Sequence, residues 1–287
     1  MSKRFTTIMR FLRTTVPIFG IFMSVNGLAQ DWTGRMVSVG NHRLFVHEVD
    51  GNQRLPTILF ESGGGGSSKD WSSVLEPIRA ATGARLIAYD RAGMGRSDAA
   101  SGSYSIVSEV DALNRVLIAS SVKTCVIVVA HSYGGFLAAL MASRDPKRLC
   151  GVVLVDANVA EFFDDAETSR IMAGYADERA EIAEKNPELA KVLDAFPQTV
   201  KTIRSAKFPA GLRLVDIVSE FTPMPTKQEA TAWRQAHARF CALDSARRCV
   251  TAAGAHHFVM ADSPKTIVDA VVAVFDYVAK NQLQPTD

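Results

Sequence analysis

One short segment constrains the fold more than any other part of the sequence, because an apolar run leads directly into a serine flanked by small residues. The run covers residues 126–130, the serine is Ser132, and Gly134 and Gly135 precede an apolar helical stretch. A serine at such a junction sits on a strained bend between strand and helix, which exposes its hydroxyl and aims the next backbone N–H at a reacting oxygen. Ala130 replaces the usual first glycine of Gly-x-Ser-x-Gly and keeps that position small. The segment predicts a nucleophile elbow at Ser132.

Strands and helices alternate along most of the chain. With 287 residues, of which 47% are hydrophobic, the chain can bury one large core, which favours a single domain over residues 30–287. The alternation specifies an α/β fold with a mostly parallel sheet flanked by helices. An antiparallel hairpin is expected first, followed by further strands and helices, at 36–39 and 43–49 (hairpin), 57–60, 85–89, 126–130, 152–155, 212–218 and 248–252 (strands), and 71–80, 107–120, 227–242 and 267–280 (helices, besides the one after Ser132).

Residues 158–208 interrupt this alternation with charged sequence of helical character. They predict a helical cap inserted into the domain. Ligands of parallel sheets bind at the carboxyl ends of the strands, so the cap is expected to form a wall of the substrate pocket.

The first 29 residues have the pattern of a secretory signal peptide. They contain four basic residues and no acidic one, then the apolar run 16–23, and small residues at Gly27 and Ala29. This layout predicts cleavage before Gln30 and export to the periplasm or the medium. The apolar run is shorter than the ~20 residues of a membrane-spanning helix, so no stable membrane insertion is expected after processing.

Net charge argues against a nucleic-acid-binding protein, and the cysteine content favours a disulfide-bonded one. The chain has 32 basic and 30 acidic residues, and without the leader 28 basic residues remain, with no basic cluster that would bind nucleic acid. Four cysteines in an exported chain favour disulfides, with Cys125–Cys150 and Cys241–Cys249 as the expected pairs. Free thiols are the alternative, and the spacings lack the Cys-x-x-Cys element of many zinc sites.

A serine nucleophile needs a base within hydrogen-bond reach. His257 is the candidate, because it lies on a loop after the last expected strand and therefore at the same edge of the sheet as Ser132. His256 is the adjacent rival. His131 precedes the serine, but the bend separates their side chains, and we expect it to have a supporting role.

The base in turn needs a carboxylate to fix its tautomer and stabilise the imidazolium. Asp156 ends the strand 152–155, and Glu220 follows the strand 212–218, so either lies at the carboxyl edge. Asp216 lies within that second strand and comes too early. We expect Asp156 to be the acid, with Glu220 as the alternative.

A glycine-rich loop follows the strand 57–60 and contains four consecutive glycines, residues 63–66. Its backbone can approach a substrate closely, and it lacks the Gly-Lys-Ser/Thr ending of a phosphate-binding loop. The backbone N–H groups of Gly64 and Tyr133 are the expected oxyanion donors.

Four blocks in the same order resemble the α/β-hydrolase superfamily across nearly the whole chain after the leader. They are Glu61-Ser62-Gly63-Gly64, Asp90-Arg91-Ala92-Gly93-Met94-Gly95-Arg96-Ser97, Ala130-His131-Ser132-Tyr133-Gly134-Gly135 and His257-Phe258 with Asp262 and Pro264. The resemblance implies Ser132 as nucleophile, His257 as base, Gly64 and Tyr133 as the oxyanion hole, and structural roles for Gly93 and Gly95. Its members place the acid either where Asp156 stands or where Glu220 stands.

These observations together predict an exported serine hydrolase that cleaves a carboxylic ester or a related acyl bond of a small molecule, with no metal or organic cofactor. Two alternatives remain open because a fold does not determine a function. One is a non-hydrolytic enzyme of the same fold, acting in C–C bond cleavage, perhydrolysis or as a lyase. The other is a non-catalytic binding protein.

Overall fold

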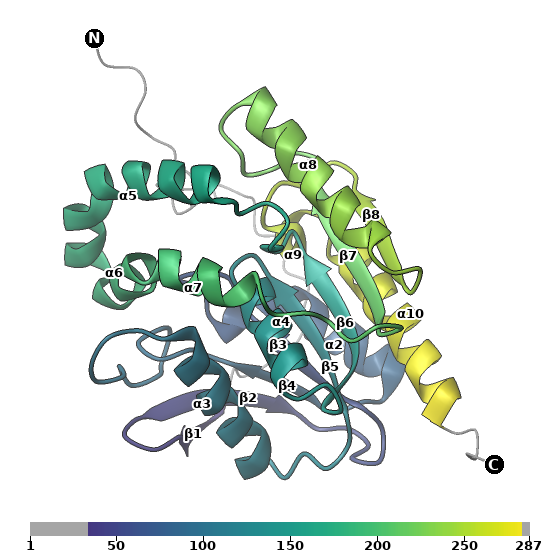
Figure 1. Ribbon diagram of the computed structural model, residues 1–287. Helices are drawn as coiled ribbons and strands as arrows, with labels where there is room; N and C mark the ends of the chain where they lie inside the picture. Colours follow the sequence, from purple (N-terminus) through teal and green to yellow (C-terminus); the bar gives the residue numbers. More distant parts are fainter. Residues whose placement is uncertain (1–33, 283–287) are drawn as a thin grey trace, which may run out of the picture.

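A single sheet organises the computed structural model, which describes residues 34–282, so the expected leader 1–29 lies outside the described residues. Its eight strands have the order β1-β2-β4-β3-β5-β6-β7-β8 (Figure 1). β1 pairs antiparallel with β2, β2 pairs antiparallel with β4, and every later pairing is parallel. The strands are β1 Arg35–Ser38, β2 Arg43–Val49, β3 Thr57–Glu61, β4 Leu86–Tyr89, β5 Val126–His131, β6 Leu149–Val155, β7 Arg213–Ser219 and β8 Arg247–Ala252. The predicted α/β fold and its hairpin are confirmed.

Helices cover both faces of the sheet, as the burial of β3 to β6 requires. One apolar core lies between the sheet and α2 with α10, and a second lies between the opposite face and α3, α4 and α8. The bounds are α2 Ser72–Thr82, α3 Ile106–Ala119, α4 Gly134–Arg144, α8 Lys227–Ala242, α9 Val259–Asp262 and α10 Pro264–Gln282. None of the helices within residues 34–282 combines the length and the apolar character needed to cross a bilayer.

Two expected elements differ from those observed. The helix expected at 71–80 is α2, which begins at Ser72 and is capped at its end by Gly83 in the left-handed conformation (φ 64°); a short 3-10 helix, η1 Ser68–Trp71, precedes it. The strand expected at 152–155 begins earlier, at Leu149, because this residue already pairs with Val126 of β5. In both cases tertiary pairing or capping, rather than apolar periodicity, determines the boundary.

Three helices lie between β6 and β7: α5 Asp165–Lys185, α6 Pro187–Asp194 and α7 Phe196–Ile203. Their starts follow from local sequence, because Asp164 accepts a hydrogen bond from the Glu167 N–H at 2.7 Å and Asn186 accepts one from the Leu189 N–H at 3.0 Å. α7 packs on α4, the helix that follows Ser132. We call these helices the α5–α7 insertion; Figure 1 shows them beyond the carboxyl end of β6.

All four cysteines are paired, as Cys125–Cys150 and Cys241–Cys249. The first bridge joins the chain just before β5 to β6, its neighbour in the sheet. The second joins α8 to β8. Both expected pairings are present.

We predict unequal losses of stability when the bridges are removed. A cross-link restricts the unfolded chain more when it closes a longer loop, and the sequence separations are 25 and 8 residues. Cys125→Ala with Cys150→Ala should lower the free energy of unfolding by about 3.5 kcal/mol, and Cys241→Ala with Cys249→Ala by about 2.5 kcal/mol. Urea denaturation of the three proteins measures this, and a larger loss for the second pair contradicts the prediction.

Candidate active site

The backbone at Ser132 makes a sharp turn between β5 and α4. Its φ is 51°, in the left-handed region that residues with a side chain rarely adopt. Its N–H donates to the Val155 carbonyl at 3.3 Å, which holds the turn against β6. Close packing makes the following glycines necessary: a Cβ at Gly134 would lie 2.7 Å from the Glu61 carbonyl oxygen, and one at Gly135 would lie 2.6 Å from the Asn158 carbonyl oxygen. The turn thus presents the Ser132 hydroxyl at the carboxyl edge of the sheet.

Two hydrogen bonds connect Ser132, His257 and Asp156. His257 Nε2 lies 3.0 Å from Ser132 Oγ, and His257 Nδ1 lies 2.7 Å from Asp156 Oδ2. The His257 side chain is 12% exposed and that of Asp156 is fully buried. Serine, imidazole and carboxylate therefore form one chain of hydrogen bonds, in which Ser132 and His257 line a cavity and Asp156 does not.

Asp156 is held by four donors. Its Oδ1 accepts from the Ser219 N–H at 3.1 Å and from the Trp233 indole at 3.3 Å, while its Oδ2 accepts from the Ser219 hydroxyl at 2.8 Å and from His257. Burial by itself would raise the pKa of Asp156, but the hydrogen bond and charge of His257 and the Ser219 N–H outweigh it and hold the pKa below its usual value. The carboxylate stays ionised beside the imidazole.

His131 supports His257 from behind. Burial, with a smaller contribution from His257, lowers the pKa of His131 to about 3, so its ring is neutral. The Nε2 of His131 lies 3.0 Å from the His257 carbonyl oxygen. Because a carbonyl oxygen can only accept, Nε2 carries the ring proton and donates it in this hydrogen bond. The two rings pack with their centroids 4.6 Å apart. His131 thus fixes the backbone of His257, in the position that the sequence had indicated for a supporting residue.

The glycine-rich loop lies beside the serine. A Cβ at Gly63 would lie 3.1 Å from Ser132 Cβ, and one at Gly64 would lie 3.8 Å from Tyr133 Cβ. Within residues 34–282, the N–H groups of Gly64 and Tyr133 donate no hydrogen bond to the protein. Tyr133 also precedes the first turn of α4, where the helix dipole is positive. The two N–H groups therefore remain available to a negatively charged oxygen.

Glu220 and His256 lie elsewhere. Glu220 is exposed, and its Oε2 accepts a hydrogen bond from the Gly254 N–H at 2.7 Å. His256 is also exposed and contacts Asp262 at 3.1 Å. The structure thus brings Asp156, and not Glu220, to His257.

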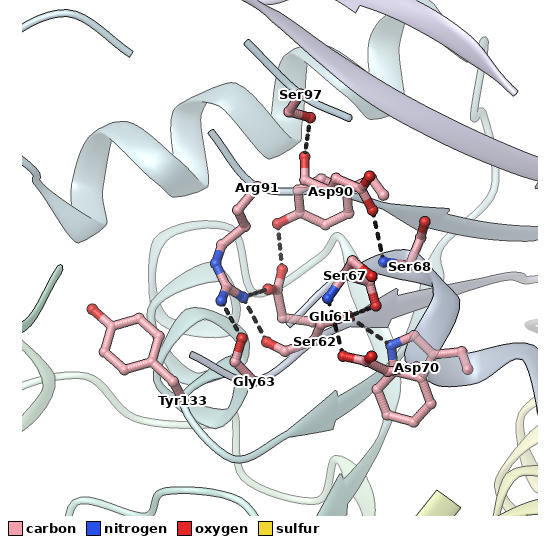
Figure 2. A network of polar contacts seen from close by, with 12 residues as sticks. Glu61, Ser62, Gly63, Ser67, Ser68, Asp70, Asp90, Arg91, Ser97 and Tyr133 are labelled. Carbon is pink, nitrogen blue, oxygen red and sulfur yellow. Dashed lines mark hydrogen bonds and ion pairs between the residues drawn. The ribbon is translucent and has the colours of Figure 1, made fainter. Parts of the chain in front are cut away.

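Sequence reasoning missed several residues that hold the site in place. Ser219 and Trp233 bind Asp156, and nothing in their local sequence indicates it. Arg91 is buried under the glycine-rich loop, where Figure 2 shows its guanidinium facing Glu61, Ser62 and Gly63. The sequence block that contains Arg91 is typical of a tight turn. It indicated structural roles for the glycines of that turn, and gave no role to Arg91.

A second buried carboxylate and imidazole pair lies behind the first. His237 on α8 contacts Asp216 in the middle of β7, with Nδ1 and Oδ2 2.7 Å apart and both side chains buried. Burial alone would lower the pKa of His237, but Asp216 outweighs it and raises that pKa. Asp216 also lies near Cys241 and Cys249, a donor set that suits a metal, yet the two sulfurs are bonded to each other and cannot act as thiolate ligands.

A cavity of about 650 Å³ opens in front of Ser132. Its floor is formed by the glycine-rich loop and the elbow, and its walls by the α5–α7 insertion and α8. The apolar part of the lining consists of Phe162, Phe163, Ile171, Leu189, Val192, Leu193, Phe196, Met224, Trp233 and Phe258. Arg170 adds a charge that is matched by Glu167 and Glu229. The cavity therefore suits a mainly apolar small molecule.

Comparison with known proteins agrees with this architecture. A family model described as the alpha/beta hydrolase fold matches residues 56–198. The chain is 36% identical over 112 residues to a protein of Variovorax paradoxus (strain S110) named "putative carbamate hydrolase RutD", and the match covers 39% of this chain and 41% of that protein. It is 35% identical over 100 residues to the uncharacterized protein YqjL of Bacillus subtilis (strain 168), which is 35% of this chain and 39% of that protein. The chain thus spans about two fifths of the length of these relatives.

Solved structures with the same fold cover far more of the chain. DbjA superposes with a TM-score of 0.64 at 18% identity, covering 87% of this chain and 99% of that one. A structure from work on carboxylesterases of Nitrososphaera gargenis superposes with a TM-score of 0.62 at 13% identity, covering 86% and 100%. At such identities the likeness establishes the fold alone.

The His237–Asp216 pair predicts a pH-dependent contribution to stability. Because the folded-state pKa of His237 is raised, the contribution is fully present below about pH 6.5 and is lost as the pH rises through the raised pKa. Asp216→Asn should therefore lower the free energy of unfolding by about 3 kcal/mol at about pH 6, and by clearly less at about pH 9.

Urea denaturation at the two pH values measures the difference. Asp269→Asn is the matched control, because Asp269 is exposed and pairs with Lys265 on the surface of α10. An equal loss for Asp216→Asn at both pH values would show that protonation of His237 makes no contribution.

Proposed function

The chain belongs to the α/β-hydrolase superfamily, and on that premise we propose that it is a serine hydrolase that cleaves a carboxylic ester or a related acyl bond through an acyl-Ser132 intermediate. The observation that carries the proposal is the chain of hydrogen bonds from Ser132 Oγ through His257 to the buried carboxylate of Asp156. A serine hydroxyl is a weak nucleophile until such a base takes its proton. Acyl transfer also requires donors that stabilise the negatively charged oxygen of the intermediate, and the N–H groups of Gly64 and Tyr133 can supply them.

The proposed reaction begins when Ser132 Oγ attacks the acyl carbon and its proton passes to His257 Nε2. Asp156 accepts the Nδ1–H of His257 and thereby stabilises the imidazolium that forms. The N–H groups of Gly64 and Tyr133 bind the oxygen that becomes negative. The bond from the acyl carbon to the leaving group then breaks as His257 Nε2 protonates that group, which leaves an acyl–Ser132 ester. A water that gives its proton to His257 attacks the acyl carbon, the bond to Ser132 Oγ breaks, and His257 returns the proton to that oxygen as the acid departs.

The cavity supports a substrate with a sizeable apolar part. The α5–α7 insertion contributes Ile171, Leu189 and Phe196 to its walls, and α8 contributes Trp233. Carbamates are acyl compounds of related chemistry, and one relative is named "putative carbamate hydrolase". A substrate panel for this protein therefore combines aryl and alkyl esters of increasing chain length with carbamates.

Labelling by a fluorophosphonate probe tests the proposal. The unsubstituted protein should be labelled at Ser132, and Ser132→Ala should abolish both labelling and ester hydrolysis. Asp156→Asn should lower kcat on the order of 10⁴-fold, since it stabilises the wrong tautomer of His257. His257→Ala should lower kcat by at least as large a factor.

Glu220→Gln provides the matched control, because it removes a charge from the same edge of the sheet without touching His257. It should retain labelling and activity. A folded, unsubstituted protein that is neither labelled nor active on any substrate of the panel would refute the proposal, and a loss of activity in Glu220→Gln alone would move the acid to Glu220.

We propose in addition that the chain is exported after cleavage of residues 1–29. The two disulfides support this, because such bonds persist in oxidising compartments. Expressed in full in a Gram-negative host, the protein should appear in the periplasm or medium with an intact mass that corresponds to a chain starting at Gln30. Ala29→Arg should block processing and cause the precursor to accumulate. A mature chain that retains Met1 or Ser2 contradicts the proposal.

A further inference from the structure

Arg91 makes contacts that connect it to the reacting centre without touching it. It follows β4 and is 3% exposed. Its guanidinium donates to Glu61 Oε1 at 2.5 Å, to the Ser62 carbonyl oxygen at 2.5 Å and to the Gly63 carbonyl oxygen. Figure 2 shows these three acceptors gathered around one end of the side chain. A single buried cation therefore binds two successive carbonyls of the glycine-rich loop.

The second of these carbonyls belongs to the peptide group that carries the Gly64 N–H. All peptide bonds in the described part of the chain are trans. In a planar trans peptide the C=O and the N–H point in opposite directions, so a hydrogen bond that fixes one fixes the other. Arg91 and the Gly66 N–H, at 3.1 Å, both bind the Gly63 carbonyl from one side. The Gly64 N–H consequently has a defined direction on the opposite side.

A glycine-rich loop requires such a restraint. A peptide group between two glycines can rotate at little steric cost, because no Cβ opposes it. Gly65, with φ 73°, extends this freedom by one residue. Without Arg91, the Gly63–Gly64 peptide group would retain only the weaker neutral bond from Gly66.

Glu61 stabilises the positive charge of the buried Arg91 side chain. Burial alone would lower the pKa of Arg91, but the carboxylate of Glu61 outweighs it and raises that pKa, so the guanidinium stays protonated. Glu61 is 1% exposed and also accepts a hydrogen bond from the Tyr89 hydroxyl. The Arg91 guanidinium carbon also lies 5.8 Å from the Tyr133 ring centroid, so the cation contacts the Gly63 carbonyl and lies near the side chain of Tyr133.

We propose that Arg91 is a positioning residue that fixes the Gly63–Gly64 peptide group and thereby aims the Gly64 N–H at the oxyanion. The inference rests on the proposed function. It assigns to Arg91 an effect on transition-state stabilisation rather than on substrate binding. Glu61 serves as the counter-ion that keeps the guanidinium beneath the loop.

Two substitutions test this inference. Arg91→Lys keeps the charge but lacks the forked donors that reach two carbonyls. Arg91→Met combined with Glu61→Gln removes the guanidinium without leaving the buried Glu61 carboxylate unpaired. Arg79→Met is the control, since Arg79 is a partly exposed arginine paired with Glu76 on α2, away from the loop.

The readout is kcat per active site, with the sites counted by end-point fluorophosphonate labelling. Removal of one oxyanion donor typically costs about 10²- to 10³-fold in kcat, so the double variant should lose about 10²-fold and Arg91→Lys about 10-fold, with KM changed by less than about threefold. Inhibition by a trifluoromethyl ketone, which adds the Ser132 hydroxyl to form an oxyanion, should weaken by the same factors. Arg79→Met should match the unsubstituted protein.

Because labelling counts only sites that are folded, a loss of stability reduces the number of sites and leaves kcat per site unchanged. If kcat per site and ketone affinity stay within about twofold of the unsubstituted protein in both Arg91 variants, the inference is overturned while the proposed function stands. If the unsubstituted protein itself is neither labelled nor active, the proposed function fails, and this inference with it.

Discussion

The left-handed backbone at Ser132 is the constraint on which the rest of the site depends. A φ of 51° at a residue with a side chain costs on the order of 1–2 kcal/mol and persists only where the surroundings enforce it. Here β6 binds the Ser132 N–H, and the Ser132 carbonyl accepts from the Gly135 N–H at 3.0 Å and the Asn158 N–H at 2.8 Å. Asp156, at the end of β6, is left-handed as well, with φ 42°. Two adjacent parallel strands thus end in strained turns, of which the one at Ser132 lines the cavity and the one at Asp156 is buried beneath it.

Two buried carboxylates, Asp156 and Glu61, lie at this edge of the sheet. An unpaired buried carboxylate costs several kcal/mol, so each one needs a complete set of partners. Asp156 obtains them from Ser219, Trp233 and His257. Glu61 obtains them from Arg91 and Tyr89. Because water is excluded from both carboxylates, their hydrogen bonds are strong and directional, and they hold the histidine and the glycine-rich loop in single orientations.

The fold was predictable from the sequence because its signals are local, as the apolar run before Ser132 and the helix after it illustrate. The choice between Asp156 and Glu220 could not be settled from the sequence, since both residues follow strands that end at the same edge of the sheet. The course of the chain after β7 decides it, because Glu220 there binds the Gly254 N–H. Arg91 escaped notice because its partners are backbone carbonyls, which carry no residue identity. Asp216 did leave a signal: a carboxylate inside an apolar strand requires a buried partner, and His237 supplies it.

The strand order explains why these two arrangements can coexist around one serine. β5 lies between β3 and β6, so Ser132 receives the loop after β3 on one side and Asp156 on the other. The β3 side offers N–H dipoles backed by the Arg91–Glu61 pair, and the β6 side offers the carboxylate that orients His257. In the acyl transfer proposed above, the first side would act on the carbonyl oxygen and the second on the hydroxyl proton. Since the two buried charge pairs share no partner, each can be altered without removing the contacts of the other, and their effects on catalysis are separable by substitution.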